Sequence, residues 1–228
     1  MKLSPGLAHF VSPPPPSPGT TPAARLSRFR GVFRKGLALP AGRALCAAAL
    51  VAVAGLASAA GPMARLVPGQ GRIAFVTKQM GVPVEGTFQH FDAQIAFDPK
   101  KPEGGSVALQ IDVGSATLGL PQSDAELPKP AWFDAARFPK ASFQSNAIKA
   151  TGGGHFEVMG KLTIKGTAQN VTVPVDIAQS GGQSVATGTL TLQRLAFKVG
   201  DGEWTDTSMV GDDVQVQFRL VLTGLGPL

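Results

Sequence analysis

The feature that most constrains the fold is a two-residue alternation of apolar and polar side chains, which recurs from Gly71 nearly to the C-terminus. In the last such run, Val214, Val216 and Phe218 alternate with Gln215. A period of two is typical of a strand with one buried face. Eight such runs, separated by turn signals and without a long helical period, predict a meandering antiparallel barrel or a sandwich.

Two positions interrupt this regular pattern. The apolar phase changes between Phe88 and Phe91, which predicts a β-bulge near Gln89 and His90. Pro174 lies inside the sixth run, and proline cannot donate a hydrogen bond to a neighbouring strand. The sequence therefore predicts an edge, a bulge or a non-bonded position at this proline.

An aromatic segment, Trp132–Ser145, follows the third predicted strand and runs into the fourth, in which Ala141, Phe143 and Ser145 alternate with polar residues. Pro130 suits the first turn of a short helix, and Pro139 would end that helix before the fourth strand. Upstream, Ser123 and Glu126 have the spacing of a capping box, which predicts another helical turn. We therefore expect a short helical insertion between strands 3 and 4.

The N-terminal region is unlike the rest of the chain. Residues 1–43 are basic and proline-rich, which predicts a disordered leader. Residues 44–60 are apolar and end in a cleavage motif at Ala59 or Ala60, which predicts a cleaved signal peptide and export to the periplasm. The alternative is an uncleaved membrane anchor. The barrel domain is expected over residues 70–224.

The length of this leader raises a second alternative, in which translation starts later, for instance at Val32, and the preceding residues are not made. The net positive charge of the chain comes from this leader. Of the 21 basic residues, seven lie before residue 60. The rest of the chain has 14 basic and 15 acidic residues, a net charge of about −1. No basic stripe remains for nucleic acid. Because Cys46 is the sole cysteine, the exported part also lacks any thiol for catalysis or metal binding.

An eight-stranded barrel is wide enough either to be filled by its own side chains or to hold one apolar ligand. The inward phases include four small residues that would leave room at the axis, Gly86, Ala93, Gly160 and Gly188. Bulges and close packing are the alternative explanation of these residues, so the pattern alone leaves both kinds of barrel open.

Several separate segments, in this order, give the chain a resemblance to the YceI-like family of periplasmic polyisoprenoid-binding proteins. One departure is Ala196, where relatives commonly carry an acidic residue. The segments are I-A-F-V-T-K-Q-M-G-V-P-V-E-G-T-F (73–88), W-F-D-A-A-R-F-P-K-A-S-F-Q-S (132–145), G-K-L-T-I-K-G (160–166), V-G-D-G-E-W (199–204) and a final V-x-V-x-F from Val214. The resemblance implies an all-β, lipocalin-like, extended eight-stranded antiparallel barrel whose apolar tunnel holds a long isoprenoid lipid. It also implies that a homodimer is a candidate assembly.

The predicted ligand-binding residues are inward-facing apolar side chains, aromatic residues that would close one end, and one polar residue at the mouth. His90 would contact a ligand head group, although an ordinary surface histidine is the alternative. The wall residues are Phe75, Val84, Phe88, Phe91, Phe97, Phe143, Leu162, Ile164, Leu190 and Phe218, and the closing residues are Trp132, Phe133 and Phe138.

Enzymatic chemistry finds little support in the sequence. After the leader only His90 and His155 remain, without a Ser/His/Asp order or a metal-binding His spacing. We therefore expect no catalytic residue, no metal and no catalytic cofactor.

The leading hypothesis is an exported, non-enzymatic protein that holds or carries a polyprenyl or quinone-type chain and touches membranes only transiently. One alternative is a filled barrel that serves stress tolerance as a structural or partner-binding module. A less favoured alternative is an enzyme that acts on an isoprenoid.

Overall fold

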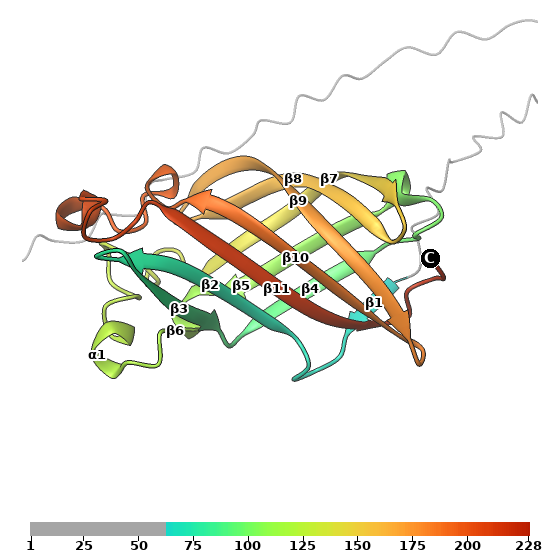
Figure 1. The fold of residues 1–228 in the computed structure, drawn as a ribbon, viewed down its shortest axis with the longest axis horizontal. Coiled ribbons are helices and arrows are strands. Elements are labelled where there is room, and N and C mark those ends of the chain that lie inside the picture. The colour runs from blue at the N-terminus through green and yellow to red at the C-terminus, as the bar shows by residue number, and fades with distance from the viewer. Residues whose placement is uncertain (1–62) are drawn as a thin grey trace, which may run out of the picture. The chain divides into compact units, whose positions relative to one another are not determined.

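The computed structural model describes residues 63–228, which form one antiparallel β-barrel (Figure 1). The predicted leader (1–43) and the signal segment (44–60) with its cleavage site lie outside the described residues. The strands are β1 Met63–Leu66, β2 Arg72–Gln79, β3 Val82–Phe88, β4 Phe91–Ala96, β5 Ser106–Asp112, β6 Ala116–Thr117, β7 Lys140–Gly152, β8 His155–Ile164, β9 Thr167–Ser180, β10 Gln183–Gln193 and β11 Asp213–Thr223.

These segments combine into eight barrel strands, as predicted. Both β1 and β2 pair with β11, so they are two parts of one strand. On their other side, β1 pairs with β4 and β2 with β3, and these in turn pair with β5 and β6. From β5 the ring continues through β7, β8, β9 and β10 to β11, which closes the barrel. The strand β1 itself was missed, because its four residues are too few to show a period.

The β-bulge predicted near Gln89 and His90 does not form. The strand is instead fully interrupted there, between β3 and β4. Residues 67–71 and the 3-10 turn η2 (Val113–Ser115) interrupt the two neighbouring strands at the same level. Side-chain and backbone bonds join these breaks: the His90 amide donates to Ser115 Oγ at 3.0 Å, and the Asp112 amide donates to the His90 carbonyl at 3.0 Å. Three strands therefore break together, which a single strand's sequence cannot reveal.

Pro174 has the non-bonded position that was one of its predicted alternatives. The pairing of β9 with β10 starts at the hairpin and ends at Val175, one residue after the proline. On its other side, Pro174 pairs with Glu157 of β8. The missing N–H therefore faces a stretch where β9 and β10 are no longer paired.

The insertion between β6 and β7 contains one short helix, α1 (Pro121–Asp124), but the predicted capping box does not form. Ser123 lies within the helix, and the N-cap position is Leu120, which offers no side-chain hydrogen bond. Asp124 instead accepts hydrogen bonds from Thr117 Oγ1 and from the Leu118 amide, both at 2.6 Å. These bonds hold the pKa of Asp124 below its usual range and tie the helix to β6.

The second predicted helix, from Pro130 toward Pro139, is wrong: this segment is a series of turns. The Phe133 amide bonds to the carbonyl of Leu127, and Asp134 has a left-handed backbone with φ of 50°. A right-handed helix cannot continue through a residue with that backbone. The part of the aromatic segment before β7 is thus positioned by turns.

The buried core lies at the end of the barrel where β11 finishes. Residues of the finishing end of β11, such as Leu222, and of the starting end of β8, such as Phe156, are almost fully buried. Phe97 and Phe156 pack edge to face there, with ring centroids 5.1 Å apart. A smaller cluster of Phe75, Leu127 and their neighbours lies at the opposite end. The two ends of the barrel are therefore built differently.

The inward glycines do not leave empty space at the axis as expected, because aromatic rings cover three of them. The rings of Phe75, Phe143 and Phe218 lie against Gly86, Gly160 and Gly188 respectively. Without a Cβ at the glycine, a ring can lie flat on the barrel wall instead of standing upright in the lumen. The glycines make room indirectly, through the orientation of their neighbours.

Gly160→Ala is expected to lower the free energy of unfolding by about 1–3 kcal/mol, the usual cost of overpacking. A Cβ at this position would lie 2.5 Å from the carbonyl oxygen of Gln144 and 2.6 Å from Cζ of Phe143. Urea unfolding measures the effect. Gly104→Ala is the matched control, since nothing lies within 4 Å of its added Cβ; equal losses in both variants would contradict the packing role.

Candidate functional site

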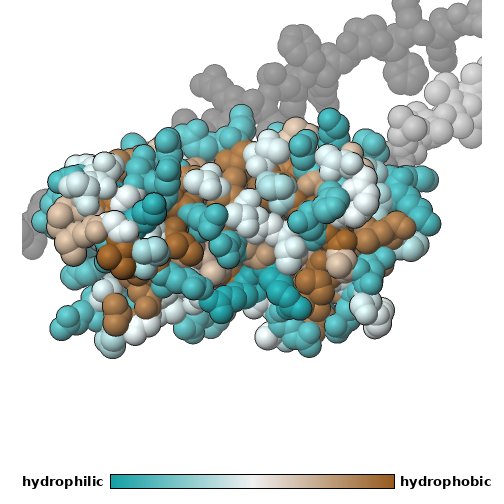
Figure 2. Space-filling view, viewed as in Figure 1, coloured by the Kyte–Doolittle hydropathy of each residue, from teal (hydrophilic) through white to brown (hydrophobic). Residues whose placement is uncertain are grey.

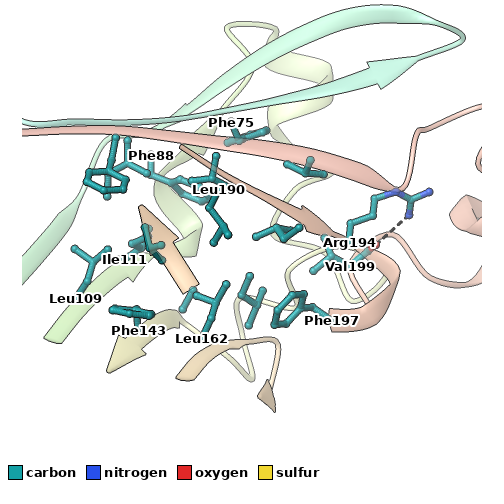
Figure 3. A pocket seen from close by; sticks show the side chains of 18 of the residues that line it. Phe75, Phe88, Leu109, Ile111, Phe143, Leu162, Leu190, Arg194, Phe197 and Val199 are labelled. Carbon is teal, nitrogen blue, oxygen red and sulfur yellow. Dashed lines mark hydrogen bonds between the residues drawn. The ribbon is translucent and has the colours of Figure 1, made fainter. Parts of the chain in front are cut away.

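An apolar cavity of about 460 Å³ runs through the barrel. Side chains from all eight barrel strands line it, and nearly all of them are aliphatic or aromatic. Figure 3 shows Phe88, Leu109, Phe143, Leu162 and Leu190 around one shared space. The volume lies within the range of small-molecule binding sites. The arrangement can enclose an apolar molecule and offers that molecule many contacts.

Inward residues near the middle of the barrel show that this space is not filled by the protein itself. Leu162, Leu190 and Phe218 line the cavity, yet each is only half-buried. Residues of a filled core are normally in contact on all sides. The exposed part of these side chains therefore faces the cavity, which counts against a filled barrel.

Two segments cover one end of the barrel, and we call them together the lid: residues 118–139 and residues 194–212 (Figure 1, left). The second includes two 3-10 turns, η3 (Leu195–Phe197) and η4 (Gly202–Thr205). Both amides of Gly200 and Asp201 donate to the Ala131 carbonyl, at 2.8 and 3.0 Å. The rings of Trp132 and Trp204 also meet, with centroids 5.4 Å apart. These contacts join the two lid segments into one cover.

Lys165, in the β8–β9 hairpin, fastens the lid to the barrel. Its side chain is only 7% exposed, and its Nζ donates to the Lys198 carbonyl at 2.7 Å and to Asp201 Oδ2 at 3.1 Å. The lid is therefore bonded to the barrel wall as well as to itself.

Arg194 is the central residue of the lid, and its side chain is buried and lines the cavity. Its guanidinium lies 6.0 Å from the ring of Trp132, and burial lowers its pKa from the usual value. Arginine nevertheless stays charged in proteins. Figure 3 shows it beside Val199, one of its partners. Its five hydrogen bonds go to the carbonyl oxygens of Val199 (3.0 Å), Gly200 (2.6 Å), Trp204 (2.6 Å), Val210 (2.7 Å) and Gly211 (3.0 Å).

The cavity reaches the surface beside the lid. Met80, at the β2–β3 hairpin, and Met209, in the lid, both line the cavity, yet they are 72% and 47% exposed. The Met80 amide donates to the Met209 carbonyl at 2.9 Å, which brings the two together. Figure 2 shows apolar side chains exposed at this end of the molecule.

The structure brings most of the predicted ligand-binding residues to the cavity. Two of the predicted closing residues, Trp132 and Phe133, reach the cavity, and turns rather than a helix position them. The lining residues among those predicted are Phe75, Phe88, Phe97, Trp132, Phe133, Phe143, Leu162, Ile164, Leu190 and Phe218.

Four predicted residues lie away from the cavity lining. Val84 is half-buried near the β2–β3 hairpin, and Phe91 packs on Gly71 at the strand break. Phe138 covers the glycine of the β8–β9 hairpin. His90 is exposed at the strand break, which agrees with the surface alternative.

Sequence reasoning missed the lining residues of the lid, above all Arg194, Phe197 and Val210. Irregular segments have no period that would show which side chains point inward. Trp204 belongs to the V-G-D-G-E-W segment of the resemblance, and that segment was the available signal.

Within residues 63–228, no group of three or more His, Cys, Asp or Glu side chains is placed to hold a metal ion. In the same part of the chain, no helix has the length and apolar character needed to cross a membrane.

The sequence matches the family model of the YceI-like domain over residues 65–222. The chain belongs to the YceI-like family. Among curated relatives, a UPF0312 protein of Yersinia pestis is 31% identical over 110 residues, and a UPF0312 protein of Azotobacter vinelandii is 33% identical over 93. These alignments cover 48% and 41% of this chain and 57% and 46% of the relatives, so the chain spans about half the length of the relatives it matches.

Solved structures share the barrel of this YceI-like protein. BcnA of Burkholderia cenocepacia is 47% identical with a TM-score of 0.67, over 68% of this chain and 98% of BcnA. A polyisoprenoid binding domain from Saccharophagus degradans, implicated in plant cell wall breakdown, has a TM-score of 0.57 over 71% of this chain and 98% of that domain. Its identity of 16% makes that likeness one of fold alone.

Proposed function

We propose that this YceI-like protein is a non-enzymatic lipid-binding protein that encloses a long isoprenoid chain, of polyprenyl or quinone type, inside the barrel. The observation that carries the proposal is the continuous apolar cavity, in which the inward side chains of Leu162, Leu190 and Phe218 are left half-exposed by the protein itself. The name of the Saccharophagus degradans domain, which shares the fold, supports isoprenoids as the lipid class.

Binding of such a chain requires no reactive group. Each CH₂ moved from water to an apolar site contributes about 0.8 kcal/mol, so a tail of several isoprene units gains a large free energy from burial. Ordering a flexible tail offsets part of that gain. An elongated apolar cavity suits a branched hydrocarbon tail better than a compact polar metabolite.

We further propose that the protein works after export to the periplasm and touches membranes only when it loads or releases its lipid. The supporting observations are the basic segment, apolar run and A-x-A motif at the N-terminus. Exposed Met80 and Met209 at the cavity mouth suit a brief contact of this kind. A homodimer remains part of the proposal on family resemblance.

Native mass spectrometry of the protein purified from the cells that make it tests the lipid-binding proposal. We expect a mass excess that organic extraction removes and that added polyprenyl lipid restores. A ligand-free mass together with no uptake of polyprenyl lipid would exclude the carrier and favour a structural or partner-binding barrel.

A further inference from the structure

The tip of the β2–β3 hairpin has a residue that suits its turn poorly. Gln79 pairs with Val82, so the loop consists of Met80 and Gly81 alone. Both loop residues have a positive φ, 47° and 80°, as in a type I′ turn. Such a turn favours Asn-Gly, because asparagine tolerates the left-handed backbone better than other side chains do. Methionine at this position therefore makes the turn less stable than asparagine would.

The fold gives Met80 little in return for this strain. Lys165 has the same position in the β8–β9 hairpin, with a φ of 48°, but its ammonium group bonds to the Lys198 carbonyl and to Asp201. The side chain of Met80 has no donor, and the residue is 72% exposed. Backbone strain that the surrounding structure does not explain is a sign of a functional position.

Exposed apolar residues continue from Met80 along the hairpin and onto the lid. Val82 and Pro83 are exposed, and so is Met209, whose carbonyl accepts the hydrogen bond of the Met80 amide. We call Met80–Pro83 together with Met209 the tip patch. Figure 1 shows the β2–β3 hairpin at the lid end of the barrel. Since Met80 and Met209 also line the cavity, the tip patch borders its mouth.

The size and the charge of the tip patch indicate what covers it. A stable interface between two proteins takes about 20–30 residues on each side, far more than this patch offers. Residues 79–84 carry no charge, so their complement is an uncharged apolar phase. The two lid segments, 118–139 and 194–212, together have seven acidic and four basic residues, a net charge of −3. Electrostatic attraction to anionic head groups is therefore not the source of binding. The hydrocarbon interior of a bilayer fits these properties, and it is also where a free isoprenoid chain dissolves.

We propose that the tip patch inserts into the surface of a lipid bilayer and brings the cavity mouth onto the hydrocarbon. An isoprenoid chain then passes between bilayer and barrel without crossing water. This inference rests on the proposed function and specifies which part of the protein meets the membrane. Because few side chains insert, the attachment is shallow and brief, and it depends on apolar burial instead of charge.

The test measures the transfer of a polyprenyl lipid to phosphatidylcholine vesicles from protein that is purified from the cells that make it. Met80→Asn removes the apolar side chain and suits the type I′ turn. Val82→Thr keeps a β-branched side chain and changes a residue that does not line the cavity. Any contribution of residues 1–62 is the same in the wild type and in all variants.

Gly181→Asn is the matched control. Gly181 and Gly182 form another two-residue loop with positive φ, between β9 and β10. This loop lies at the packed end, where Gln183 pairs with Thr223, the last residue of β11. Nothing lies within 4 Å of an added Cβ at Gly181. The control therefore places the same asparagine in the same kind of turn, away from the cavity mouth.

We expect the transfer rate of the wild type to rise with vesicle concentration, because docking precedes transfer. Met80→Asn should lower this vesicle-dependent rate by about 10-fold, and Val82→Thr by about 3-fold, since each puts a polar group where apolar area was buried. The control should transfer lipid at the wild-type rate. An effect of Met80→Asn alone, without one of Val82→Thr, would assign the loss to the cavity lining and overturn docking by the tip patch.

The stability of Met80→Asn is expected to change in the opposite direction from its transfer rate. Because asparagine suits the turn, the melting temperature of the lipid-stripped variant should equal or exceed that of the wild type. A lower melting temperature together with slower transfer would mean that Met80 serves the fold, and would contradict its role at the membrane.

Four further results would also decide the matter. A transfer rate that does not depend on vesicle concentration would overturn docking while the lipid-binding function stands. Faster transfer when the vesicles contain phosphatidylglycerol, if salt abolishes it, would show attachment through charge and would overturn apolar insertion. A smaller assembly of Met80→Asn than of the wild type would show that a second copy covers the tip patch. A wild type that takes up no polyprenyl lipid would instead remove the proposed function itself.

Discussion

Replacing Ala93 with Trp is expected to lower the affinity for a long isoprenoid by at least about 100-fold, while the free energy of unfolding changes by less than about 1 kcal/mol. Ala93 lies in β4, opposite Leu109, and its small side chain lines the cavity. An indole there would occupy lumen that the tail needs. Displacing three or four CH₂ groups accounts for a loss of this size.

The same variant separates a lipid carrier from a filled barrel. In a filled barrel a Trp at position 93 would overpack the core and cost about 1–3 kcal/mol of stability. In a barrel with a cavity, the indole enters free space. The measurements are urea unfolding of the lipid-stripped protein and retention of a polyprenyl lipid.

Gln94→Trp is the matched control for Ala93→Trp, because adjacent residues of a strand point to opposite faces. Gln94 is exposed on the outer face of β4, so lipid retention should match that of the wild type. Loss of lipid in both variants would show that a Trp disturbs β4 from either face and would contradict the lumen as the binding site.

Replacing Arg194 with Met is expected to destabilise the protein by about 3 kcal/mol and to open the lid. The five carbonyl oxygens that Arg194 serves would lose their donor in a buried place. Each buried carbonyl that loses its donor costs about 1–3 kcal/mol unless it reaches water. The lid should therefore move into solvent, where water bonds these carbonyls and the total loss of stability stays below the sum of five separate losses. Limited proteolysis should then cut within residues 194–212.

Arg194→Lys should fall between wild type and Arg194→Met, since an ammonium has three donors and lacks the planar fork of a guanidinium. Arg219→Met is the control: Arg219 is exposed on β11 and makes one hydrogen bond, of 3.3 Å, to the Gln70 carbonyl. Similar proteolysis of the Arg194→Met and Arg219→Met variants would contradict the central role of Arg194 in the lid.

The barrel could be predicted because its strands carry a strong period of two. Phe75, Leu162, Leu190 and Phe218 all lie on the inward face that the alternation indicated. The phase change after Phe88 located an interruption, but its form depends on two neighbouring strands that break at the same level.

The lid could not be predicted in this way. Asp134 has a left-handed backbone, which no pattern of residues indicated. Because of this backbone, turns form where a helix was predicted. In the sequence, Arg194 is one of many basic residues. In the fold its guanidinium donates to backbone carbonyls as distant in sequence as that of Gly211. The sequence does not show such bonds, because they depend on the path of the folded backbone and not on the type of a partner side chain. The flat rings over Gly86 and Gly160 likewise depend on register between strands.

The difference between the two ends of the barrel affects how long a ligand stays bound as well as how tightly it binds. One end is filled by tightly packed side chains such as Phe97 and Phe156, and the other is covered by turns that Arg194 and Lys165 hold in place. A molecule enclosed between them leaves at the covered end, where the cavity reaches the surface beside Met80 and Met209. If movement of the turns must widen this mouth before a long chain can pass, that movement sets the residence time, and two lipids of very different affinity then depart at nearly the same rate.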